Sequence, residues 1–376
     1  MGKLRQWLKK LQERVKKHPA ITWTIVCASV AIIITVVYVS VTAVQQFQAK
    51  ANPQFVDENH KITFADENFE KVVRKELKRP HGDIYLLELA QIKQLTIKDN
   101  TEICDISDLQ YFMDLEKLEI TGTQVRDISA LSGLVNLTDL NLSNNQIRSI
   151  EPLSNLDNLV NLTLLGNTIT DLSPIYGLED LETLDVSQNN IREVGEKIQN
   201  LYRLRSCDIS NNRVSSLAAF SGMGNLQILK ASNNKLTEVP TFENMLSLTE
   251  LSLGGNAIQQ IESLGEVPSL EVLSLSRNLI GNLDFAPDCL QLKELNISYN
   301  DVKNLSPLSQ CYNLALLHLE GTLVEDLTPL HNLSYFSAIY LDPDFDRTQI
   351  DFMVDHFSTG DFETKKYIID QKHDLL

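Results

Sequence analysis

The side chains that could do chemistry in this chain are carboxylates in two small groups. Asp342, Asp344 and Asp346 alternate along the sequence, and their oxygens are of the type that binds calcium. They lack the glycine and the closing glutamate of an EF-hand loop, so we expect no calcium site there. Asp185 and Asp208 form the second group, provided that the fold brings their segments side by side.

Motifs of the common enzyme classes are missing from the sequence. It contains no HExxH, no GxSxG, no Walker A loop and no GxGxxG after a strand. The seven histidines are scattered along the chain. We therefore expect no catalytic residue, no cofactor and no bound metal, and a function in binding rather than in catalysis.

A repeat with a period of 22 residues sets the elements that must position any binding residue. Its frame is L-x-x-L-x-L-x-x-N, with two single-residue insertions along the chain. A fixed period of this length predicts stacked strand-and-turn units, because each unit buries its apolar side only against its neighbours. The last position of the frame needs a polar side chain that satisfies the backbone of the turn. This ladder position holds Asn100, Thr123, Asn145, Asn167, Asn189, Asn212, Asn234, Asn256, Asn278, Asn300, Thr322 and Asp344.

Alternate strand residues between the leucines should point to the open, concave face of a parallel sheet. Most of these positions are polar, but several in the later repeats are apolar or aromatic. Adjacent groups of this kind are candidate anchors for a protein partner, and the alternative is incidental surface hydrophobes. The candidates are Ile228, Val272, Leu316, His318 and Tyr340, with Arg277 and Tyr299 at the rim.

The same alignment puts Asp185 and Asp208 on neighbouring strands. Two like charges side by side cost stability unless another group offsets them. Lys230, on the following strand, is the internal partner that we expect. A basic residue of a binding partner, or a cation, is the functional alternative.

Charge is divided unevenly along the chain. Residues 1–20 carry seven Lys or Arg and one Glu, although the whole chain has a net charge of −17. The acidic remainder repels the phosphates of nucleic acids and so opposes a nucleic-acid role.

Residues 21–44 are 24 positions without a charged side chain, long enough to cross a bilayer core of about 30 Å. The basic flank predicts a cytosolic N-terminus and an extracytoplasmic body, the type II arrangement. The alternative is a secretory signal cleaved after Ala51, although the apolar run exceeds the roughly 7–15 residues of such signals. We expect a single-pass plasma-membrane protein whose residues 45–62 form a stalk.

Helical segments are expected at both ends of the repeats, which span residues 92–346. The first repeat of a stack would otherwise expose its apolar side to water. Residues 63–91 form the predicted N-terminal cap, with Asp66 placed to begin a helix that runs to Leu77. Residues 347–376 form the predicted C-terminal cap.

Five cysteines are present, and we expect those of the repeats to be small buried apolar residues. They are Cys104, Cys207, Cys289 and Cys311. Cys289 and Cys311 occupy the same position in successive repeats, so their spacing also allows a disulfide.

The frame L-x-L-x-x-N-x-I-x-D-[IL]-x-P-L-x-x-L follows F-x-D-x-N-F-x-x-V-V-R at residues 64–74. This combination resembles the internalin-type leucine-rich repeat proteins of Gram-positive bacteria, over roughly residues 62–344. The resemblance implies an α/β solenoid with a parallel concave β-sheet and short convex turns. The membrane anchor, and an end without an LPxTG sorting signal, distinguish this chain from the secreted internalins.

We therefore expect a non-enzymatic cell-surface module, a receptor or adhesin, that binds a protein or peptide through its concave face. The alternative is a structural or assembly subunit of a membrane complex, with the repeats as an extracytoplasmic scaffold.

Overall fold

The computed structural model describes residues 60–356. Residues 1–20, 21–44, nearly all of 45–62 and 357–376 of the sequence predictions therefore lie outside the described residues. Contacts divide the chain into two units, and the larger one, Thr63–Ile84 with Glu88–Leu376, contains the repeats. Within residues 60–356, no helix combines the length and the apolar character needed to span a membrane.

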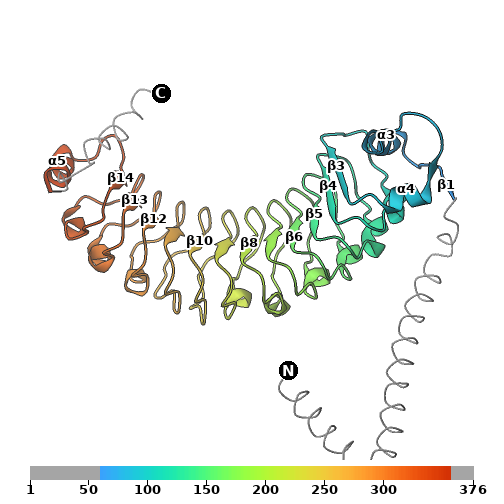
Figure 1. Ribbon diagram of the computed structural model, residues 1–376. Helices are drawn as coiled ribbons and strands as arrows, with labels where there is room; N and C mark the ends of the chain where they lie inside the picture. Colours follow the sequence, from blue (N-terminus) through green and yellow to red (C-terminus); the bar gives the residue numbers. More distant parts are fainter. Residues whose placement is uncertain (1–59, 357–376) are drawn as a thin grey trace, which may run out of the picture. The chain divides into compact units, whose positions relative to one another are not determined.

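Twelve parallel strands form one sheet in the order in which they occur along the chain. Because the repeat places the same residue type every 22 positions, each strand pairs with its neighbours in register, as Leu162 does with Leu184. Within the repeat unit the strands line the concave side (Figure 1). They are β3 (Gln94–Lys98), β4 (Lys117–Thr121), β5 (Asp139–Asn141), β6 (Asn161–Thr163), β7 (Thr183–Asp185), β8 (Ser206–Asp208), β9 (Ile228–Lys230), β10 (Glu250–Ser252), β11 (Val272–Ser274), β12 (Glu294–Asn296), β13 (Leu316–His318) and β14 (Ala338–Tyr340).

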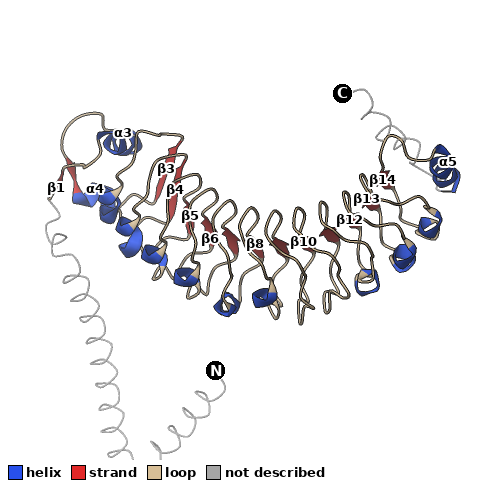
Figure 2. Ribbon diagram, turned by 180° about the vertical axis from the view of Figure 1, so that it is seen from behind, coloured by secondary structure: helices blue, strands red, loops and turns tan. Residues whose placement is uncertain are grey.

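Short 3-10 helices occupy the convex side of the repeat unit (Figure 2). Several have a proline as their second residue, as at Pro152 and Pro174, because proline suits the first turn of a helix. They are η2 (Ser107–Tyr111), η3 (Ser129–Gly133), η4 (Glu151–Leu153), η5 (Ser173–Ile175), η6 (Glu196–Asn200), η7 (Ala218–Phe220), η8 (Ala286–Asp288), η9 (Ser306–Gln310) and η10 (Thr328–Leu330). The parallel-sheet solenoid with short convex turns is confirmed.

The core of each repeat is a layer of buried Leu, Ile and Val side chains, closed at the strand-to-turn corner by the ladder asparagine. Asn189 shows the pattern: its Nδ2 donates to the carbonyls of Leu164 and Val186, both at 3.0 Å. Its Oδ1 accepts from the N–H of Ile169 at 2.9 Å. Each ladder asparagine from Asn145 to Asn300 joins its own turn to the preceding repeat in this way.

The two ends of the ladder depart from the prediction. Asn100 is half-buried, and its Oδ1 accepts only a local bond from Glu102 N at 3.2 Å. Asp344 is exposed and makes no ladder bond among residues 60–356. The ladder of bonds between repeats thus runs from Thr123, whose hydroxyl donates to Asn145 Oδ1, to Asn300. The Thr322 hydroxyl donates only within its own repeat, to Leu319 O at 2.7 Å.

The predicted N-terminal helix is present as α3 (Glu67–Glu76), and Asp66 accepts from Asn68 N and Phe69 N at its start. Phe69 is fully buried, with its ring centroid 6.1 Å from that of Phe112. A short helix α4 (Leu86–Ala90) follows, together with a two-stranded sheet of β1 (Lys61–Ile62) and β2 (Ile84–Tyr85) that was not predicted. At the other end of the repeats lies α5 (Arg347–His356).

The cysteines of the repeats are free thiols, so the alternative of a Cys289–Cys311 disulfide is wrong for this structure. Burial raises the pKa of the Cys289 thiol to about 12 and that of Cys311 to about 11. Burial also raises the pKa of Cys207 far above its ordinary value. Cys104 is exposed, which corrects the expectation that it is a buried apolar residue.

Candidate protein-binding surface

The strand residues singled out in the sequence lie on the concave face of β7 to β14. Asp185, Asp208, Ile228, Lys230, Val272, Leu316, His318 and Tyr340 are all half-buried. Each alternates with a buried leucine, isoleucine or cysteine of the core, because successive strand residues point to opposite faces of a sheet. The concave face is therefore formed by side chains that the core does not use.

The apolar residues that open β9, β11 and β13 alternate with acidic residues across the sheet. Glu250 lies between Ile228 and Val272 in the sheet register. Glu294 lies in the same way between Val272 and Leu316. Since neighbouring strands are about 4.8 Å apart, successive apolar side chains are separated by roughly 10 Å with a carboxylate between them.

His318 and Tyr340 form one aromatic pair on the last two strands. Their ring centroids are 4.3 Å apart and the ring planes differ by 1°, so the rings are stacked. His318 Nδ1 also lies 3.7 Å from Glu320 Oε2. The stack fixes the position of both rings on an otherwise open face.

Arg277 and Tyr299 form a second pair at the strand-to-turn corner. Both have left-handed backbones, with φ of 55° and 56°. Arg277 Cζ lies 4.3 Å from the centroid of the Tyr299 ring, within the range of a cation–π contact. A Cβ on Gly321, at the same corner of the next repeat, would come within 2.5 Å of Tyr299 Cδ1, so only glycine leaves room for this ring position. Tyr299 remains 49% exposed, which leaves much of its surface available to a partner.

Asp185 and Asp208 are neighbours in register, as predicted. Their partners differ from the expectation, because Lys230 pairs with Glu250, at 3.3 Å, rather than with either aspartate. Asp185 accepts from Ser187 N at 2.9 Å and from Ser187 Oγ at 2.6 Å. Asp208 accepts from Ser210 N at 2.8 Å. The two carboxylates are thus held by their own strands.

No cluster of three or more His, Cys, Asp or Glu side chains within residues 60–356 is arranged to hold a metal ion. The alternating aspartates after β14 have local roles instead. Asp342 accepts from Gly321 N at 2.8 Å, and Asp346 accepts from Thr348 N at 2.8 Å.

Two family models match parts of the chain. One is described as leucine-rich repeats in two copies and matches residues 114–155 and 246–288. The other is the leucine-rich repeat region of leucine-rich repeat and WD repeat-containing protein 1, at residues 194–264. The chain is a leucine-rich repeat protein. No characterised protein matches it at the level of sequence.

Solved structures show the same fold at low identity. An internalin (InlF) of Listeria monocytogenes is 24% identical, with a TM-score of 0.52, and the match covers 76% of this chain and 96% of that one. InlJ of Listeria monocytogenes is 22% identical, with a TM-score of 0.69, covering 80% and 65%. TLR13, solved in complex with ssRNA13, is 22% identical, with a TM-score of 0.53, covering 68% and 42%. These identities establish the leucine-rich repeat fold, and they do not place the chain among the internalins.

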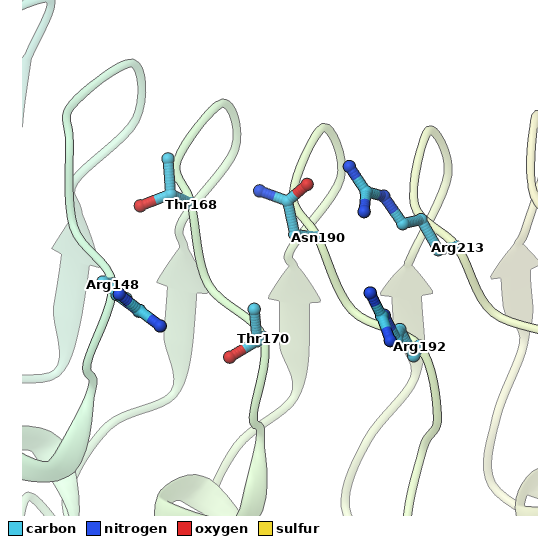
Figure 3. Close-up of a pocket in the computed structure, with 6 residues that line it drawn as sticks. All are labelled: Arg148, Thr168, Thr170, Asn190, Arg192 and Arg213. Carbon is cyan, nitrogen blue, oxygen red and sulfur yellow. The ribbon is translucent and has the colours of Figure 1, made fainter.

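This leucine-rich repeat protein also has an open groove of about 550 Å³ that was not predicted from the sequence. Its lining consists of Arg148, Thr168, Thr170, Asn190, Arg192 and Arg213. Figure 3 shows Arg148, Thr170 and Arg192 in one row, with Thr168, Asn190 and Arg213 in a second row beside it. The signal is present in the sequence at the first and third positions after the ladder asparagines, which lie outside the strands.

Proposed function

We propose that this leucine-rich repeat protein is a non-enzymatic, membrane-anchored module that binds another protein through the concave face of its last repeats. The observation that carries the proposal is the presence of two ordered aromatic pairs, Arg277–Tyr299 and His318–Tyr340, within four successive repeats. Solenoid repeats of this kind offer extended concave surfaces for binding.

Tyrosine and arginine are the residue types most often responsible for the energy of a protein interface. Here their conformations are already restricted before any partner arrives. The stack holds Tyr340, and the glycine at 321 together with Arg277 holds Tyr299. A partner therefore does not have to order these side chains, an entropic cost of about 0.5–1.5 kcal/mol for each one immobilised.

The residues that open β11, β12 and β13 define the chemistry of the partner surface. Val272 and Leu316 are apolar, and Glu294 between them has no ion pair within residues 60–356. A partner surface that places a Lys or Arg between two apolar side chains would match this order. Such a surface is amphipathic and basic.

A nucleic-acid ligand is not part of this proposal, although TLR13 is described in complex with single-stranded RNA. The net charge of −17, in a chain whose first 20 residues are basic, makes the repeat unit strongly acidic. Phosphate backbones are repelled by a field of that sign.

The location of the repeats is also a proposal, and it rests on the sequence of residues 1–44. The uncharged stretch of 24 residues after a basic segment supports a single-pass anchor with the repeats outside the cytoplasm.

Binding measurements on concave variants test the protein-binding role. With the full chain as bait for extracellular proteins, we expect Tyr299→Ala and Tyr340→Ala each to weaken the captured complex by roughly tenfold or more. Tyr312→Ala is the matched control, because Tyr312 is 58% exposed and lies before β13 rather than in it. Loss of binding in the control, with the two concave variants unaffected, would refute the assignment of this face.

A further inference from the structure

The groove of Arg148, Arg192 and Arg213 is a concentration of positive charge on an acidic protein. All three arginines are exposed, and none of their guanidinium groups has an acidic partner among residues 60–356. Some other exposed basic residues do have such partners, as Arg203 has in Asp180 at 2.8 Å. The groove arginines therefore keep their hydrogen-bonding capacity for a ligand.

The acidic residues that follow the groove positions do not neutralise it. Asp171 comes directly after Thr170, and its two oxygens accept from Ser173 N and Ser173 Oγ, each at 2.8 Å. Glu193 comes directly after Arg192 and is exposed, without an ion pair in the described part of the chain. Glu193 is not among the residues that line the groove.

The spacing of the arginines follows from the repeat. Arg148 and Arg192 lie at equivalent positions two repeats apart, and Arg213 belongs to the repeat after Arg192. With repeats stacked about 4.8 Å apart, Arg192 lies roughly 10 Å from Arg148 along the stack, and Arg213 roughly 14 Å. A single small anion cannot contact all three, whereas an extended chain can. Acidic residues four positions apart in an extended peptide are roughly 13 Å apart and lie on the same side.

The polar residues between the arginines match a peptide backbone. Thr170 and Asn190 have no side-chain hydrogen bond among the described residues, while the Thr168 hydroxyl donates to Ile147 O at 2.9 Å. A free hydroxyl and a free carboxamide can both donate and accept, so they can pair with the N–H and C=O groups of a peptide. A polyphosphate chain presents acceptors only and would leave the acceptor atoms of these side chains unused.

We propose that this groove binds an acidic segment of a partner protein in an extended conformation, with its carboxylates on Arg148, Arg192 and Arg213. Arginine forks bind carboxylates in a bidentate, charge-assisted manner. The segment crosses the repeats of β5 to β8 and contacts the protein only at the groove, because the rest of the surface repels it. This site differs from the concave face of β9 to β14 in its position and in the charge of its ligand.

Fluorescence anisotropy with the full chain tests the proposal. The probe is a labelled peptide in which glutamate and serine alternate over about eight residues, a length of roughly 26 Å when extended. We expect it to bind at low ionic strength, to weaken as NaCl rises, and to bind at least tenfold more tightly than the same peptide with glutamine in place of glutamate.

The decisive variant combines Arg148→Gln, Arg192→Gln and Arg213→Gln, and we expect it to weaken the glutamate peptide at least tenfold. A control that removes the same charge combines Arg203→Gln, Arg205→Gln and Lys293→Gln, three exposed basic residues that already have acidic partners. The control should stay within twofold of the unmodified chain, and so should Tyr340→Ala, which tests the concave face separately.

Three results would overturn the proposal. One is absence of binding, and another is an equal loss in the groove variant and in the charge-matched control. The third is tighter binding of an oligouridylate, or displacement of the peptide by inorganic phosphate at equal anion concentration, since either would assign the groove to phosphate ligands.

Discussion

At the scale of single residues, the ladder asparagine connects the backbones of two successive repeats through its side-chain hydrogen bonds. Asn189 is 7% exposed, and its side chain serves the carbonyls of Leu164, Val186 and Ser187 and the N–H of Ile169. Four backbone groups in two successive repeats depend on one carboxamide. Threonine, as at Thr322, can replace only part of this set, because it has one donor.

Replacing Asn189 by alanine should therefore destabilise the repeats strongly. A buried backbone group without a partner costs about 1–3 kcal/mol, and several such groups would be left here, so we expect a loss of about 3 kcal/mol. Urea unfolding followed by circular dichroism measures it. Asn155→Ala, at an exposed position with one long bond of 3.4 Å to Ser154, should change the unfolding free energy by less than about 0.5 kcal/mol. Equal effects of the two changes would contradict the account of the ladder.

The buried thiols give a second prediction at this scale. Burial holds the pKa of Cys289 and Cys311 near 12 and 11, so at pH 8 both are protonated and unreactive. A short pulse of N-ethylmaleimide, read by peptide mass mapping, should modify Cys104 but leave Cys207, Cys289 and Cys311 unmodified until urea unfolds the chain. Native labelling of Cys289, or a disulfide joining it to Cys311, would be inconsistent with the structure.

At the scale of elements, Asp66 connects helix α3 with the first turn of the repeats. Its Oδ1 accepts from Asn68 N at 2.8 Å and Phe69 N at 3.0 Å, and its Oδ2 accepts from Cys104 N at 3.3 Å. Burial acts to raise the pKa of Asp66, but the hydrogen bonds from Phe69, Cys104, Asn68 and Asp105 bring it below the ordinary value. The charged carboxylate is therefore the form that stabilises the helix.

We expect Asp66→Ala to destabilise α3 by about 1–2 kcal/mol at pH 7, the usual contribution of such a cap. Because the folded-state pKa is lowered, this contribution is fully present above the unfolded pKa of about 3.9 and is lost as the pH falls through the folded value. Amide hydrogen exchange of residues 67–76 measures the effect.

Glu76→Ala, at the exposed end of the same helix, should leave the exchange of α3 unchanged. A difference between Asp66→Ala and the unmodified chain that persists undiminished well below pH 4 would argue against the carboxylate as the cap.

The elements were predictable from the sequence where the 22-residue period determines them. The period predicts which strand residues face the concave side. It also predicts that Asp185 and Asp208 lie side by side, because strands stacked in register allow only one alignment. It did not predict the partner of Lys230, because Asp208 lies directly opposite that lysine in the register. The ion pair forms instead with Glu250, which lies opposite Ile228 on the other neighbouring strand. The groove at Arg148 is lined by side chains from successive repeats, which the residue type at one repeat position does not reveal.

The strands β1 and β2, each of two residues, are too short for a sequence pattern to be recognised.

At the scale of the whole molecule, the proposed anchor determines where the binding surface is displayed. The uncharged segment 21–44 predicts that the chain stays in the membrane fraction after alkaline carbonate extraction. Protease added to intact cells should digest the repeats and leave the basic N-terminal segment protected. Deletion of residues 1–44 should abolish membrane association. Recovery of the unaltered chain in the soluble fraction, or as a product cleaved after Ala51, would contradict the type II arrangement.

The concave binding surface and the groove are proposed to bind ligands of opposite charge, although both belong to one acidic solenoid. The concave face after β9 suits a basic, amphipathic partner surface, and the groove between β5 and β8 suits an acidic segment. Since they lie in different repeats, variants of one should not alter the other, as sites that far apart usually behave independently.

The central claim is that a protein partner sits on the concave face of the last repeats, and site-specific photo-cross-linking tests it most directly. A benzophenone side chain replaces Tyr340 in one full-length chain and Tyr335 in another. Both tyrosines belong to the last repeat, but Tyr335 is 68% exposed and precedes β14, whereas Tyr340 lies in it. We predict a discrete protein adduct on irradiation from position 340 and none from position 335. An adduct from 335 alone, or equal adducts from both, would contradict the claim.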